Sequence, residues 1–87
     1  MEDPTESRVV YTFGRGKRQE IRILVKKYNA HYYMDLRVWY QPENSQDFRP
    51  TRKGLCLPLE FSGELQKGVE RLAKVADRFS DFKPPRS

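Results

Sequence analysis

Apolar and polar residues alternate along much of the first two thirds of the chain, which is the pattern of strands with one buried face. The alternation is clearest over residues 21–28 and 32–40, and shorter β-branched or aromatic runs cover residues 8–13 and 55–57. The alternation is interrupted by a glycine-containing basic turn at residues 14–18, a tight connection at 29–31 and a polar loop at 41–51. The pattern therefore predicts four strands.

The spacing of apolar residues along the chain changes after Pro58. Between residues 62 and 79 the apolar side chains recur three or four positions apart, which is the spacing of an amphipathic helix. Those residues are Leu65, Val69, Leu72, Ala76 and Phe79. Ser62 is the expected N-cap of this helix. The predicted order is β-β-β-β-α, an α+β fold with one long C-terminal helix.

The 87 residues fit one domain, and its core is expected to be marginal because a chain this short buries little of its surface. We expect the domain to span residues 8–79, between a disordered leader (residues 1–7) and a flexible tail (residues 80–87) that contains a pair of prolines. Cys56 is the single cysteine, so an internal disulfide cannot supplement the core. Oligomerisation is therefore the expected way in which the chain supplements its small core.

Positive charge is concentrated in the first half of the domain. Residues 14–54 hold ten Lys and Arg against four acidic residues, a net +6, whereas the whole chain carries +5. This distribution favours a polyanionic partner. No segment has the length and hydropathy of a membrane-spanning helix, and the lone thiol suits a reducing compartment. We therefore expect an intracellular protein with no membrane partner.

An enzyme is not expected from this sequence. No phosphate-binding glycine loop is present, because the segment Gly14–Gly16 is too short and no Lys-Ser or Lys-Thr pair follows it. His31 and Cys56 alone do not make a metal site, so neither a metal nor another cofactor is predicted. Asp35 lies two positions from Arg37 on one strand face, where a structural ion pair is the simplest interpretation.

Binding to unpaired nucleic acid is the function that the pattern favours. One face of the strand at 32–40 presents Tyr33, Arg37 and Trp39, and the preceding strand ends in Lys26, Lys27 and Tyr28. Cations neutralise phosphates while aromatic rings stack on exposed bases, which duplex DNA hides. Ordinary sheet packing explains any single ring equally well. An RNA-binding module and a protein-interaction domain with a basic docking face are the alternatives.

The motifs in their order resemble the DNA-binding domain of the transcriptional positive cofactor 4 family. An Asp-aliphatic-Arg strand (residues 35–37) is followed by Trp39 and by a basic-Pro-x-Arg-Lys-Gly-aliphatic-x-Leu segment (residues 49–57), and then by the amphipathic helix. The resemblance covers about residues 9–76. It implies a curved four-stranded antiparallel sheet, a homodimer that forms through the helices, and grooves for single-stranded DNA.

The resemblance also implies which residues bind nucleic acid. Tyr28 matches the family's stacking aromatic, and Arg37, Arg52 and Lys53 match its phosphate-contacting cations. The remaining predicted contacts are Lys26, His31, Trp39 and Tyr40. The tryptophan is shifted by one position from the family pattern, so Trp39 and Tyr40 compete for a stacking role.

The expected function is sequence-tolerant single-stranded DNA binding in transcription regulation, or in replication or repair. The expected protein partners are components of the transcription or replication machinery. The basic turn at residues 14–19 lengthens the first connection, and the family's Ser-rich acidic leader has no counterpart in residues 1–7. The missing leader favours a compact bacterial or phage member, in the cytoplasm or nucleoid. A eukaryotic member would be nuclear.

Overall fold

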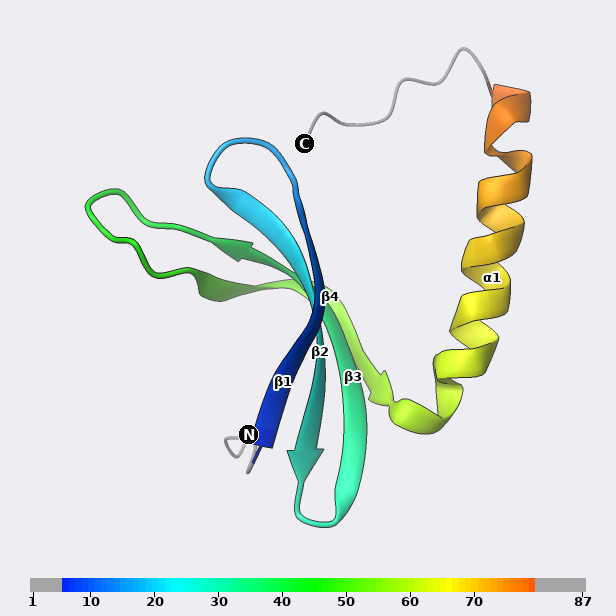
Figure 1. The fold of residues 1–87 in the computed structure, drawn as a ribbon, viewed down its shortest axis with the longest axis horizontal. Coiled ribbons are helices and arrows are strands. Elements are labelled where there is room, and N and C mark those ends of the chain that lie inside the picture. Colours follow the sequence, from blue (N-terminus) through cyan, green and yellow to red (C-terminus); the bar gives the residue numbers. More distant parts are fainter. Residues whose placement is uncertain (1–5, 80–87) are drawn as a thin grey trace.

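The computed structural model describes residues 6–79, which form one four-stranded antiparallel sheet followed by a helix (Figure 1). The strands lie in sequence order, so each is bonded to its neighbour in the chain. Their bounds are β1 Glu6–Gly14, β2 Gln19–Tyr28, β3 His31–Tyr40 and β4 Arg49–Pro58. The short 3-10 helix η1 (Leu59–Phe61) leads into α1 (Ser62–Val75), and η2 (Ala76–Phe79) follows it. The predicted α+β fold with its curved sheet is confirmed.

All four strands are longer than predicted, and the boundaries of β4 and of the helix differ most. Strand β4 begins at Arg49 and includes Pro50, which an edge strand tolerates because its outer N–H groups need no partner. Ser62 is the first residue of α1 and not its N-cap; Phe61 occupies that position without a side-chain cap, because η1 leads directly into the helix. The last turn, from Ala76, is a 3-10 helix.

Strand β1 begins at Glu6, inside the predicted leader, and the remaining leader residues 1–5 lie outside the described part of the chain. The predicted tail, residues 80–87, also lies outside it. Within residues 6–79 no helix is long and apolar enough to span a membrane.

The pairing register gives the sheet two chemically different faces. Residues directly opposite one another share a face, so Val25 lies beside Met34 and Leu57 on one side, and Lys26 lies beside Tyr33 on the other. We call the first the apolar face; it carries Tyr11, Phe13, Ile21, Ile23, Val25, Tyr32, Met34, Leu36, Val38, Tyr40, Leu55 and Leu57. We call the second the cation face; it carries Arg22, Lys26, Tyr28, Tyr33, Asp35, Arg37, Trp39 and Cys56.

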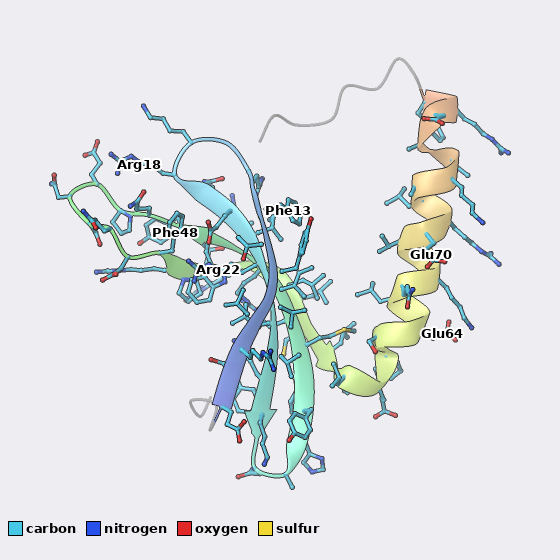
Figure 2. The ribbon with its side chains drawn as sticks, viewed as in Figure 1. Phe13, Arg18, Arg22, Phe48, Glu64 and Glu70 are labelled. Carbon is cyan, nitrogen blue, oxygen red and sulfur yellow. The ribbon has the colours of Figure 1, made fainter. Side chains whose placement is uncertain are left out.

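The apolar face has little cover within the chain. Figure 1 shows α1 standing apart from the sheet on one side, and Figure 2 shows that Phe13 points to this side while Arg22 and Phe48 point away. No residue of α1 is buried. Among the described residues the buried apolar side chains are Met34 and Val38 on the apolar face and Leu24 on the cation face. The Cα radius of gyration is 15.0 Å, against about 12 Å for a compact domain of this length. The single chain is thus open, with its apolar surfaces exposed.

Candidate nucleic-acid interface

A buried carboxylate organises the centre of the cation face. Asp35 is 2% exposed, and its two oxygens bind different cations: Oδ2 lies 3.1 Å from Lys26 Nζ and Oδ1 lies 2.6 Å from Arg37 Nε. The hydrogen bond to Asp35 raises the pKa of Arg37 above its usual value. One acid therefore fixes two cations from adjacent strands and leaves the group with a net positive charge.

Three of the cations predicted to contact nucleic acid line a single cavity on this face, and two of them, Arg37 and Arg52, were predicted to contact phosphates. Lys26 of β2, Arg37 of β3 and Arg52 of β4 surround a space of about 350 Å³, which Asp35, Pro50, Thr51 and Cys56 complete. Cations from three strands thus converge although they lie far apart in the sequence. Three positive charges against one carboxylate make this cavity suited to an anionic ligand.

An aromatic pair lies beside these cations at the end of the β2–β3 hairpin. The rings of Tyr28 and Tyr33 meet edge to face, with centroids 5.5 Å apart and planes at 74°. His31 is exposed and lies directly opposite Tyr28 in the register. The geometry fixes the orientation of the Tyr28 ring through Tyr33, which belongs to the same face as the cavity.

Trp39 and Tyr40 lie on opposite faces of β3, as alternation requires. Trp39 shares the cation face with Arg37, whereas Tyr40 is on the apolar face and 38% exposed. The guanidinium of Arg22 lies 4.4 Å from the centroid of the Trp39 ring and also 5.2 Å from that of Phe48 (Figure 2). The buried Trp39 Nε1 has no hydrogen-bond partner among the described residues. Arg22 therefore occupies part of the Trp39 surface that a base would need for stacking.

Arg52 and Lys53 lie in an irregular part of β4. Arg37 pairs with Gly54 and Trp39 pairs with Pro50, so the single residue Val38 faces three residues of β4. The two extra residues make the segment 51–53 bow away from β3, and we call this segment the β4 bow. Arg52 and Lys53 are exposed and make no ion pair within residues 6–79. Both cations are consequently free to meet a phosphate.

Sequence reasoning missed Arg22 of the cation face and Phe48 of the neighbouring loop. The contact of Arg22 with the rings of Trp39 and Phe48 depends on how the 41–48 loop folds back. The loop is held by Gln41 N, which donates to Arg18 O at 2.8 Å, and by a bond from Arg18 Nη1 to Pro42 O at 3.3 Å. The alternation of polar and apolar residues along a strand does not predict such a contact. The available signal was the position of Arg22 between Ile21 and Ile23, since alternation places it on the same strand face as Lys26.

A comparison of the sequence with known protein families finds a match. Residues 16–68 match the model of the family described as Transcriptional Coactivator p15 (PC4). The chain belongs to this family. The matched segment is well over half of the chain and runs from the β1–β2 turn through β4 into the first half of α1. No curated protein and no solved structure matches the chain.

Family membership confirms the resemblance found in the sequence and indicates nucleic-acid binding and transcription coactivation. All eight predicted contact residues lie within the matched segment, although the match itself assigns no role to any of them. The structure brings Lys26, Arg37 and Arg52 together at the cavity. Tyr28, His31, Trp39 and Lys53 do not line this cavity, and Tyr40 lies on the opposite, apolar face of the sheet. Within residues 6–79, no three His, Cys, Asp or Glu side chains gather as metal ligands would.

Proposed function

We propose that this protein is a homodimeric, sequence-tolerant single-stranded DNA-binding protein that acts in transcription. The observation that carries the proposal is the convergence of Lys26, Arg37 and Arg52 on one cavity of the cation face. Phosphates along a strand would meet these cations, and the exposed cations of the β4 bow would extend the path. Family membership supports the same function.

The aromatic residues of the cation face favour unpaired over duplex DNA as the ligand. Tyr28 and Tyr33 lie next to Lys26 in the register, so a base can stack on a ring while its phosphate meets a cation. The bases of a duplex are already stacked and do not offer their faces. Contacts to phosphates and to the faces of bases carry little sequence information, which also suits a sequence-tolerant binder.

The proposed homodimer follows from the surfaces that one chain leaves bare. On α1, Val69 is 53% exposed and Leu72 is 65% exposed, and the apolar face of the sheet exposes Tyr11, Phe13 and Leu55. Phe13 points to the side of the sheet on which α1 lies (Figure 2). Exposed apolar patches of this kind mark an interface. The α1 helices of two copies, packed together through these side chains, would cover them.

Replacing Leu72 with Glu should convert the dimer to a monomer. The side chain is exposed in the single chain, so the substitution costs an isolated chain little, whereas a charge buried between two helices is strongly unfavourable. Sedimentation or light scattering at fixed protein concentration measures the mass. Arg71→Glu places the same side chain on the neighbouring, polar position and should leave the dimer intact. A wild-type chain of monomeric mass would refute the dimer.

Fluorescence anisotropy of a labelled dT oligonucleotide, titrated at several salt concentrations, tests the proposed binding. A matched duplex and a matched RNA oligonucleotide run alongside. We expect salt-dependent binding with a preference for the single DNA strand. Stronger binding to RNA would indicate the RNA-binding alternative. No binding of any oligonucleotide at low salt would overturn the proposal and leave a protein-docking role for the cation face.

Removing Arg52 and Lys53 together should weaken the binding and lower its salt dependence. Each phosphate contact to a single strand contributes about 0.7 to the slope of log K against log salt, so two lost contacts should lower it by about 1.4. Tyr28→Ala is the contrasting variant. It should weaken binding by about 1–3 kcal/mol with an unchanged slope, because stacking releases few counterions. An unchanged slope in the double variant would contradict the role of the two cations.

We also propose that the protein acts by binding alone, without catalysis, and that its partners include the transcription machinery. A role in transcription implies an intracellular location, in the nucleus of a eukaryote or the nucleoid of a prokaryote. Replication and repair also expose single strands, and a sequence-tolerant binder would serve them equally. Binding that depends on strandedness and not on sequence is the property common to these processes.

A further inference from the structure

The bow in β4 is held by one side chain. The Thr51 hydroxyl donates a hydrogen bond to Val38 O at 2.8 Å and accepts one from Lys53 N at 3.1 Å. These two bonds cross the irregular segment where the ordinary strand ladder is interrupted between Arg37 and Trp39. The hydroxyl thus satisfies a carbonyl of β3 and an amide of the bow that the ladder leaves unmatched.

The carbonyl of the same residue reaches the centre of the cation face. Arg37 Nη1 donates a hydrogen bond to Thr51 O at 2.9 Å, while Arg37 Nε binds Asp35. A continuous series of polar contacts therefore runs from Lys26 through Asp35 and Arg37 to Thr51, and from Thr51 to the backbone of Lys53. The position of the bow is coupled through Thr51 to the cavity that Arg52 lines.

We propose that Thr51 is a positioning residue for nucleic-acid binding: its hydroxyl holds the β4 bow in the shape that presents Arg52 and Lys53 to the ligand. This inference rests on the proposed function. Two flexible cations on a loose segment must lose conformational freedom when a phosphate binds, and a bow that is already fixed reduces that loss. Thr51 also lines the cavity, but its hydroxyl is engaged by Val38 O and Lys53 N, so its role in this account is to position the two cations.

The test compares Thr51→Val with Thr51→Ser. Valine keeps the β-branched shape and removes the hydroxyl, whereas serine keeps the hydroxyl and removes the methyl group. Loss of the hydroxyl should weaken dT oligonucleotide binding by about 3- to 10-fold, and serine should restore binding to within about twofold of the wild type. Ser45→Ala is the control, because it removes a loop hydroxyl that accepts the N–H of the residue two positions on, Asp47, at 3.1 Å, and it should bind like the wild type.

A double-mutant cycle separates positioning from a general structural effect. In a chain that already carries Arg52→Ala and Lys53→Ala, Thr51→Val should cause almost no further loss of affinity, because the cations it positions are absent. An equal loss in both backgrounds would overturn the inference. So would wild-type affinity in Thr51→Val, or a serine variant that binds as weakly as the valine variant.

Hydrogen exchange of the Lys53 amide tests the inference without any ligand. Its exchange should be about 3- to 10-fold faster in Thr51→Val and unchanged in Thr51→Ser, since the hydroxyl accepts this N–H. If the wild type binds no oligonucleotide, the proposed function fails while this measurement still reports whether the hydroxyl holds the bow. If Thr51→Val does not fold, Thr51→Ala is measured in its place. Unchanged exchange in the variant that lacks the hydroxyl would overturn the inference.

Discussion

Asp35→Asn should lower the free energy of unfolding by about 3 kcal/mol, a large part of the stability of a small domain. The carboxylate is 2% exposed, and it compensates Lys26 and Arg37, whose side chains are 17% and 20% exposed. An amide of the same shape leaves both cations partly buried without their counter-charge. Urea unfolding at a fixed protein concentration measures the change.

Asp47→Asn is the control for this experiment. It makes the same chemical change at an exposed position of the loop between β3 and β4, where the effect should stay within about 0.5 kcal/mol. A loss below about 1 kcal/mol in Asp35→Asn would contradict the assigned role, and solvent rather than the carboxylate would then have to stabilise the two cations.

Gly54→Ala should also destabilise the fold strongly, by about 3 kcal/mol. An added Cβ would lie 2.2 Å from Arg37 Cβ and 2.3 Å from Leu36 O, both parts of the neighbouring strand that cannot rotate away. The φ angle of +157° is also one that side chains rarely adopt. Thermal or urea unfolding measures the loss, which should appear together with weaker oligonucleotide binding because the bow ends at this residue.

Gly14→Ala is the matched control, since an added Cβ there meets nothing within 4 Å. Its stability should remain within about 0.5 kcal/mol of the wild type. Equal stability of the two variants would mean that β4 relaxes away from β3 without cost, and that the close approach at Gly54 does not hold the bow in place.

The strands and faces could be predicted from the sequence because alternation reports them directly. The separation of Trp39 from Tyr40 followed from their adjacent positions, and the ion pair of Asp35 with Arg37 from their spacing of two. The second partner of Asp35 could not be predicted. Lys26 reaches it from β2, and that contact depends on the register between strands, which a one-residue slip would change completely.

The bow and the position of the helix were beyond sequence reasoning for a different physical reason. Alternation predicted only residues 55–57 as the fourth strand, because two extra residues at the Arg52–Lys53 step interrupt the pairing while Arg49 and Pro50 already belong to the sheet. The helical period showed that α1 has an apolar stripe. It did not show whether the chain's own sheet or a second copy covers that stripe, since both would satisfy the same pattern.

Because Arg22 stacks on Trp39, the intrinsic tryptophan fluorescence of the protein can report ligand binding. The chain has a single tryptophan, so its emission arises from one known place on the cation face, next to a guanidinium. A ligand that displaces Arg22, or that brings a base against the indole, changes the surroundings of that emitter directly. The intensity and wavelength of tryptophan emission therefore distinguish a ligand bound near Trp39 on the cation face from contacts made elsewhere on the molecule.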